Sequence, residues 1–281
     1  FGRVIPEQKK QIIQAYKGAG RVVAMTGDGV NDVLALKCAD CSVAMASGSD
    51  AASNAAQIVL LDSDFSKMPE VVLEGRRVVN NIQTSASLFL VKNIFSILTT
   101  VFTLIAANLY PLYPTQLSLL GAFTIGTPAF VLALQPNKEL IRGDFLVNVI
   151  LKALPAGLAD FIMLAAISIH GNILGMSNEQ ISTVAIVILL FIGLAALVRI
   201  CRPFDGIRIL LCLAMAAGIV ICVLNFKGIF AITTVNMIML RMIIMYALIA
   251  GVLFCIMCKS VGGWIDYMER HSKRFRMLLK G

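Results

Sequence analysis

The chain has 281 residues, of which 58% are hydrophobic and only 14% charged, and its mean hydropathy is +0.85. Soluble globular proteins carry about 45–50% apolar and about 25% charged residues, so this composition excludes a chain that is soluble or disordered throughout. The formal net charge of +8 comes from basic residues that lie mostly at the ends of long apolar runs. That pattern is typical of membrane topology and argues against nucleic-acid binding.

The first 80 or so residues are polar enough to form a soluble domain that mixes strands and helices. Three short apolar runs predict strands at residues 21–25, 42–45 and 58–61. Polar and apolar residues alternate with helical spacing in three segments, at residues 7–16, 30–38 and 50–57. Strands that alternate with helices form a parallel sheet, and ligands bind at the carboxyl ends of its strands.

The remainder of the chain is dominated by apolar runs that are long enough to cross a membrane. A charged helix is expected at residues 69–83, and a span needs about 20 apolar residues. Six runs meet this length, at residues 85–108, 116–134, 146–170, 181–200, 207–225 and 238–258. Lys and Arg gather in alternate loops and after the last run, which predicts that the soluble part and both ends of the chain are cytosolic.

The most informative segment is Thr-Gly-Asp-Gly-Val-Asn-Asp at residues 26–32, where a predicted strand passes into a predicted helix. Asp28 and Asp32 stand four residues apart in this glycine-rich turn, and their carboxylates can share a hard cation such as magnesium. The glycines let the backbone approach a phosphate, and the amino terminus of the following helix favours an anion. A solvated turn between strand and helix is the alternative, and the length of the string argues against it.

This segment, followed by Ala-Leu-Lys at 35–37 and Ala-Asp at 39–40, resembles the hinge motif of P-type ATPases. These are membrane pumps whose phosphorylation domain has the haloacid dehalogenase fold. Arg3, Pro6 and Lys9 resemble the family's Arg-x-x-Pro-x-x-Lys segment, and the resemblance covers essentially the whole chain. It implies an α/β Rossmann-like (haloacid dehalogenase-type) partial domain, followed by an all-α polytopic membrane domain of six helices, the family's fifth to tenth.

The resemblance also implies a division of the chain. The expected regions are 1–68, the carboxy-terminal part of the phosphorylation domain; 69–84, a linking stalk helix; 85–260, the membrane domain; and 261–281, a basic cytosolic tail. The sequence opens at Phe1 without Met or a signal peptide, and it contains no Asp-Lys-Thr-Gly-Thr. We therefore expect the phosphorylated Asp, the nucleotide-binding domain and the first four helices in a missing amino-terminal part of the same polypeptide.

The resemblance assigns the catalytic site to Lys9, Thr26, Gly27, Asp28, Asn31 and Asp32. By this resemblance Asp28 binds the catalytic Mg²⁺, with Asp32 as the second carboxylate of the magnesium site, and Asp32 and Asn31 position the phosphate and water. Lys9 would neutralise the charge of the phosphorylated Asp, as electrostatic catalysis of phosphoryl transfer requires. Mg²⁺ is thus the expected cofactor and ATP the expected substrate.

Polar residues inside the predicted spans are candidates for a transport path, because a charge at mid-membrane costs at least about 2.5 kcal/mol. Lys92 and Ser96 lie near one face of the first span, with Asn93 on an adjacent face. Thr124 and Pro128 interrupt the second span, where a loosened helix could expose carbonyl groups to a cavity. Two alternatives stay open, a Lys92 that snorkels to the cytosolic interface and a kink that serves packing alone.

The resemblance puts the usual calcium site in doubt. Calcium pumps of the family have an acidic residue in the fifth helix and an Asn/Asp pair in the sixth, whereas Ser96, Gly121 and Ile125 stand at those positions here. Calcium prefers several oxygen ligands with charge among them, so Lys92 should repel it or act as an internal counter-cation. Asp160 lies in the third span and could supply a carboxylate, although that helix usually stands outside the family's transport path.

The sequence therefore predicts the carboxy-terminal part of an ATP-driven P-type cation pump that works through an aspartyl-phosphate intermediate. Its expected place is a bacterial plasma membrane, with a transported cation and membrane lipids as partners and no nucleic acid. One alternative is a P-type pump or flippase for a lipid or another polar substrate. A second is a non-catalytic membrane protein that retains a phosphatase-like domain for binding or regulation.

Overall fold

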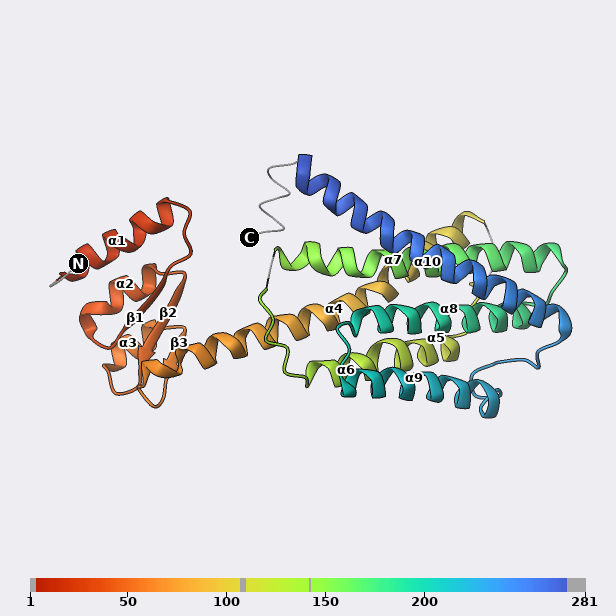
Figure 1. Ribbon diagram of the computed structural model, residues 1–281, viewed down its shortest axis with the longest axis horizontal. Coiled ribbons are helices and arrows are strands. Elements are labelled where there is room, and N and C mark those ends of the chain that lie inside the picture. The colour runs from red at the N-terminus through yellow and green to blue at the C-terminus, as the bar shows by residue number, and fades with distance from the viewer. Residues whose placement is uncertain (1–3, 107–109, 142, 272–281) are drawn as a thin grey trace. The chain divides into compact units, whose positions relative to one another are not determined.

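The computed structural model describes residues 4–106, 110–141 and 143–271 (Figure 1). Arg3 and residues 272–281 of the expected basic tail lie outside these described residues. The chain divides into two compact units, Phe1–Leu73 and Glu74–Gly281. The long helix α4, Met68–Ile105, begins in the first unit and continues through the second.

The first unit contains a three-stranded parallel sheet in the order β1-β2-β3. Its strands are β1 Ala24–Gly27, β2 Cys41–Met45 and β3 Ile58–Leu60. Its helices are α1 Pro6–Gly18, α2 Val33–Cys38 and α3 Asp50–Ala55, with 3-10 turns at Val30–Asp32 and Phe65–Lys67. The predicted parallel α/β arrangement is therefore confirmed.

Small side chains determine how closely the elements of this unit pack. Leu36, Ala44 and Ala52 form its buried core, and the small Ala44 and Ala52 let α3 approach β2 closely. The hydroxyl of Ser49 accepts the backbone N–H of Ala52 at 3.2 Å and caps the amino terminus of α3.

Three predicted boundaries in this unit were wrong by a few residues. The first strand begins at Ala24 instead of residue 21. Val22 is 89% exposed, and the backbone N–H of Val23 donates to the carboxylate of Asp40. The predicted helix 30–38 starts as a 3-10 turn, in which the N–H of Asp32 donates to the carbonyl of Gly29. The predicted helix 50–57 ends at residue 55, because the next residues turn back to donate to Ser42 on β2.

The second unit consists of helices that are long and apolar enough to form six membrane spans, as predicted. After α4 the helices are α5 Pro114–Gly121, a π-helical turn at Ala122–Gly126, α6 Thr127–Ala133, α7 Phe145–Ile173, α8 Asn178–Ile200, α9 Gly206–Asn225 and α10 Met237–His271. The second span comprises α5, the π turn and α6. The predicted stalk helix and first span are one continuous helix, α4, and α10 continues past residue 260.

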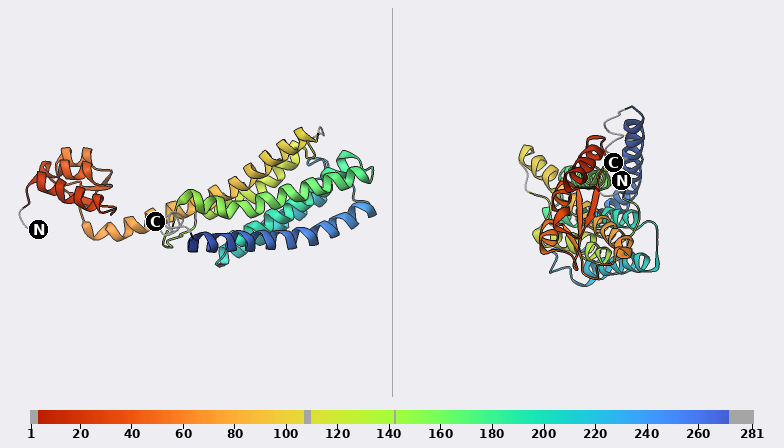
Figure 2. Two further views of the ribbon diagram at one scale, coloured as in Figure 1. Left: turned by 90° about the horizontal axis from the view of Figure 1, so that it is seen from above. Right: turned by 90° about the vertical axis from the view of Figure 1, so that its left-hand side faces the viewer.

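The interior of this unit is formed mainly by α7, α8 and α10, which contact one another along their lengths. Figures 1 and 2 show that the axes of these helices are roughly aligned, and that α10 crosses α7 and α8 obliquely. Met163 on α7 and Ile188 and Leu189 on α8 are buried in the core. Large apolar side chains remain exposed on the outer helices, as expected of surfaces that face lipid tails.

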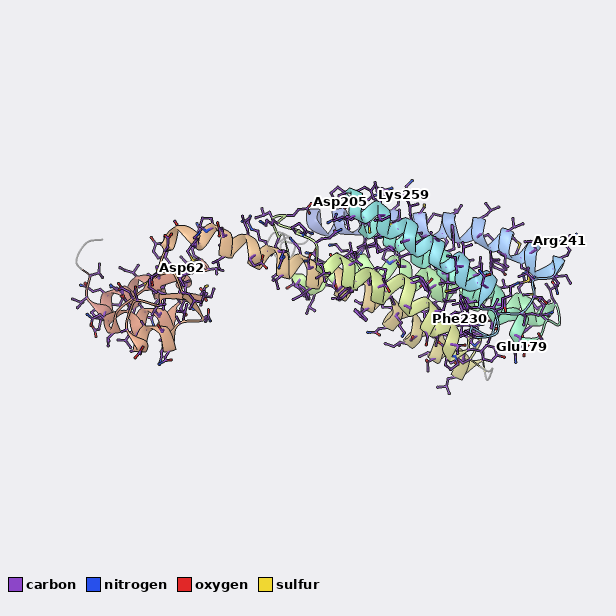
Figure 3. All side chains as sticks on the ribbon, turned by 90° about the horizontal axis from the view of Figure 1, so that it is seen from below. Asp62, Glu179, Asp205, Phe230, Arg241 and Lys259 are labelled. Atoms are coloured by element: carbon purple, nitrogen blue, oxygen red, sulfur yellow. The ribbon has the colours of Figure 1, made fainter. Side chains whose placement is uncertain are left out.

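The loops alternate between the two ends of the helical unit. Figure 3 shows Asp205 and Lys259 at one end, and Glu179, Phe230 and Arg241 toward the other. The α8–α9 connection and the carboxy-terminal part of α10 thus share an end, while the α7–α8 and α9–α10 connections lie opposite. This arrangement is the one required of helices that cross a membrane in alternating directions.

Candidate catalytic site and transport path

Asp28 follows β1 directly, and its backbone is fixed by the loop that follows β2. The N–H of Ser49 donates to the carbonyl oxygen of Asp28 at 2.7 Å. Gly48 lies so close that an added Cβ would stand 2.3 Å from the same oxygen, so only glycine fits there. The Asp28 side chain itself is exposed. The parallel sheet thus presents an accessible carboxylate on a rigidly held backbone.

Asp32 forms the strongest polar contact of this site. Lys9 on α1 donates to its Oδ1 at 2.6 Å, and the backbone N–H of Gly29 lies 3.5 Å from Oδ2. Asp32 is only 7% exposed, and burial alone raises the pKa of its carboxyl; the hydrogen bond and charge of Lys9, with backbone N–H groups, outweigh this and lower the pKa overall. Asp32 is therefore an anion whose charge Lys9 compensates.

The other residues of the motif surround this pair. Gly27, at the end of β1, packs against Asp32 so tightly that a Cβ would stand 2.5 Å from the Asp32 Cβ. Thr26 lies half-buried on β1 opposite Val43, and Asn31 is exposed in the 3-10 turn. Direct contacts thus join Lys9, Gly27 and Asp32, while Asp28 and Asn31 stay open to a ligand.

Sequence reasoning missed the contribution of Gly48 and Ser49. Both residues clamp the backbone of Asp28, although they follow it by about twenty positions. The available signal was the Gly-Ser-Asp string just before a predicted helix, because Ser before Asp is a common start of a helix. That signal predicts a cap, and only the sheet register reveals that the capped turn also contacts Asp28.

The donor set fits a magnesium ion held mainly by Asp28. Within the described residues, no group of three or more His, Cys, Asp or Glu side chains could hold a metal by itself. Mg²⁺ is commonly bound by one or two carboxylates together with water and substrate phosphates, which matches the exposed carboxylate of Asp28 in the glycine-rich turn. The Oδ1 of Asp32 is already bonded to Lys9, so in this structure Asp32 acts as the partner of the lysine.

The candidate transport residues fall into two groups in the second unit. Lys92 on α4 and Thr124 in the π turn line one small cavity, and the hydroxyl of Thr124 donates to the carbonyl of Leu120 at 2.6 Å. Ser96 is half-buried and Asn93 is exposed, and neither is among the residues that line this cavity.

The predicted interruption of the second span is present as the π turn at Ala122–Gly126. Pro128 is buried just after it and has no N–H to donate to the carbonyl of Thr124, four residues earlier. The π turn thus interrupts the regular helix beside the cavity that Thr124 lines.

Comparisons with known proteins agree with this division of the chain. Residues 8–66 match the family of haloacid dehalogenase-like hydrolases. Over 226 residues the chain is 42% identical to the probable cation-transporting ATPase exp7 of Streptococcus pneumoniae, which covers 78% of this chain and 29% of that protein. Over 235 residues it is 43% identical to the calcium-transporting ATPase CtpE of Mycobacterium bovis, with 79% and 30% of the two chains covered. The chain thus spans less than a third of the length of these relatives.

Proposed function

We propose that this chain, which belongs to the P-type ATPase family, is the carboxy-terminal part of an ATP-driven pump that moves cations across a membrane. One observation carries the proposal, the match to cation-transporting ATPases over 78–79% of the chain. A match of that length must include parts of both the haloacid dehalogenase-like domain and the membrane helices. The proposed division is the expected one, with residues 1–68 in the phosphorylation domain, 69–84 as the stalk, 85–260 in the membrane and 261–281 as the tail.

In the proposed reaction, the γ-phosphoryl group of ATP passes to a carboxylate oxygen of an Asp in the amino-terminal part of the polypeptide, and ADP leaves. Water later hydrolyses this acyl phosphate and releases inorganic phosphate. Lys9 stabilises the phosphoryl oxygens electrostatically while Asp32 holds its ammonium in place. Asn31, exposed in the same turn, orients the phosphate and the attacking water. Asp28 would hold Mg²⁺, which would supply positive charge to the phosphoryl oxygens.

The proposed transport path runs past Lys92 and Thr124, with Asn93, Ser96 and Pro128 beside it. Two features support it: Lys92 and Thr124 line one cavity, and a helix interruption lies next to it. We place the soluble unit and both ends of the chain on the cytosolic side of a bacterial plasma membrane, in contact with its lipids. The positive charge of alternate loops and the bacterial relatives support this orientation and origin.

The test uses the complete polypeptide, purified and reconstituted into lipid vesicles. Vanadate-sensitive ATPase activity is measured at fixed magnesium and pH while free calcium is titrated, and then sodium, potassium and manganese separately. We expect activity that depends on one of these cations and is lost in Asp28→Asn. Stimulation by micromolar calcium would indicate that this pump carries calcium, as the name of the relative CtpE states for that protein.

The two alternatives predict different results in the same assay. Activity that ignores cations but requires a particular phospholipid would support the flippase. Complete lack of ATP hydrolysis by the intact, folded protein would support a non-catalytic role for the phosphatase-like domain.

A further inference from the structure

The carboxyl group of Asp160 is the acidic group among the buried side chains of the second unit that have an unpaired polar atom in the described residues. It lies in the middle of α7, is 3% exposed, and its Oδ1 has no hydrogen-bond partner among the described residues. Buried polar groups are almost always paired, because leaving one unpaired costs free energy, and a buried charge costs far more. An unpaired carboxyl oxygen that lines a cavity is a candidate ligand for a cation.

The cavity beside Asp160 has the size and lining of a site for one ion. Its volume is about 20 Å³, which is enough for a single water molecule or one dehydrated cation. Among the residues that line it, Asp160 and Lys92 carry the charged groups and Thr124 adds one hydroxyl, which donates to the carbonyl of Leu120; the other side chains are apolar. The cavity thus joins an anionic oxygen ligand from α7 to the two residues of the proposed path.

Close helix contacts at two glycines bring these side chains together. Gly157 on α7 packs on α4, where an added Cβ would lie 2.9 Å from Ile94 and 3.1 Å from the carbonyl oxygen of Val91. Gly193 on α8 packs on the π turn, where a Cβ would lie 2.6 Å from the Cγ2 of Thr124. Asp160 stands about one turn along α7 from Gly157, so the first contact holds its carboxyl against the helix that carries Lys92.

The ammonium of Lys92 lies beside α5. Its Nζ is close enough to Gly121 on α5 that an added Cβ would stand 3.9 Å from it. No ion pair joins Lys92 to an acidic group within the described residues. Lysine carries its charge on a flexible four-carbon chain, so this ammonium can reach the cavity or withdraw from it.

We propose that Asp160 is the carboxylate ligand of the transported cation, and that Lys92, which lines the same cavity, is an internal cation whose flexible side chain can reach this carboxylate when the cargo is absent. This inference rests on the proposed function and names the charged ligand of its transport site. The cavity supplies one negative charge, so the cargo and the ammonium of Lys92 exclude each other. The carboxylate that the resemblance expects in the fifth and sixth helices of a calcium pump is instead contributed by α7.

The experiment compares three variants of the complete, reconstituted pump with the wild type. Vanadate-sensitive ATPase activity is measured as a function of calcium, manganese, sodium and potassium, each titrated alone. Asp160→Asn keeps the shape of the side chain and removes its charge, and should raise the half-stimulating cation concentration about tenfold or more. Lys92→Met removes the competing ammonium and should lower that concentration. Ser168→Ala removes another buried, unpaired polar group of α7 that does not line the cavity, and should change nothing.

The outcomes separate this inference from the function on which it rests. If no cation stimulates the wild type, the proposed function fails. If the wild type is stimulated and Asp160→Asn responds identically, the pump remains and Asp160 is not a ligand. Equal losses in Asp160→Asn and Ser168→Ala would likewise reduce Asp160 to a structural role. If Asp160→Asn does not reach the membrane, Lys92→Met tests the proposal instead. An unchanged or weaker response of Lys92→Met to the cation would contradict competition between Lys92 and the cargo.

Discussion

At the scale of single residues, one of the two ion pairs that join distant parts of the soluble domain lies in the candidate catalytic site. Lys9 lies on α1 and Asp32 follows β1, and their contact of 2.6 Å places a compensated charge next to the exposed Asp28. Since Asp32 is nearly buried, its carboxylate cannot recover the lost interaction from water when the lysine is removed.

Lys9→Met should therefore loosen the domain as well as impair the proposed phosphoryl transfer. We expect the free energy of opening at β1 to fall by about 1–3 kcal/mol, the cost of leaving a buried polar group unpaired. Hydrogen exchange of the β1 amides in the intact protein measures this. Lys10→Met is the control, because Lys10 forms no ion pair within the described residues. Equal effects of both substitutions would contradict the assignment.

The lowered pKa of Asp32 predicts how stability depends on pH. A carboxyl whose pKa is lower in the folded state than its ordinary value of 3.8 stabilises the fold above that value. This contribution disappears as pH falls through the lowered pKa, because both states then bind the proton. The difference in opening free energy between wild type and Asp32→Asn should be constant from about pH 7 to 5 and shrink below about pH 4. A difference that does not vary with pH would show that the pair is not ionic.

At the scale of elements, glycines decide which helices of the membrane unit can touch. Gly157 and Gly193 lie at contacts too close for any side chain, whereas Gly251 on α10 has nothing within 4 Å of an added Cβ. Glycine is therefore required for close packing at the first two positions and is not required for packing at Gly251. Only the first two positions shape the cavity that Lys92 and Thr124 line.

Alanine at these glycines should change stability in opposite directions. Gly157→Ala forces α7 away from Ile94 on α4 and should cost about 1–3 kcal/mol through overpacking. Gly251→Ala adds a methyl group in open space within a helix and should stabilise by up to about 1 kcal/mol. Thermal unfolding of the detergent-purified protein should show a lower Tm for the first variant and a higher one for the second. A higher Tm for Gly157→Ala would mean that α4 and α7 are not in close contact.

At the scale of the whole molecule, the proposed orientation determines which loops meet the cytosol. Basic residues cluster in alternate connections, and Asp205 and Lys259 lie at one end of the helical unit while Glu179 and Arg241 lie at the other (Figure 3). With both ends cytosolic, the end with Lys259 should face inward.

Cysteine labelling tests this orientation directly. In a cysteine-free background, Lys138→Cys in the α6–α7 loop should react with a membrane-impermeant maleimide only in inside-out vesicles. Lys227→Cys in the α9–α10 connection should react only from the outside of intact cells. Permeabilised membranes provide the control, in which both positions should be labelled. The reverse pattern would invert the proposed topology.

The sequence by itself determined the class of the protein and its order of parts. Apolar runs of about 20 residues can hardly exist except as membrane spans, so composition was enough to predict six helices. The resemblance of residues 26–32 to the hinge motif of P-type ATPases likewise predicted the kind of soluble domain, and the match of residues 8–66 to haloacid dehalogenase-like hydrolases agrees with it. The division at residues 68, 84 and 260 and the roles of the site residues stay predictions.

The tertiary structure decided which distant residues meet. That Gly48 clamps Asp28, that Lys9 compensates Asp32, and that Asp160 shares a cavity with Lys92 all depend on how elements pack. Local sequence encodes helices and turns through short-range sterics and hydrogen bonds, which act over a few residues. Contacts between elements depend on the shapes of two surfaces that are far apart in the chain, so a rule based on the spacing of residues in the sequence cannot predict them.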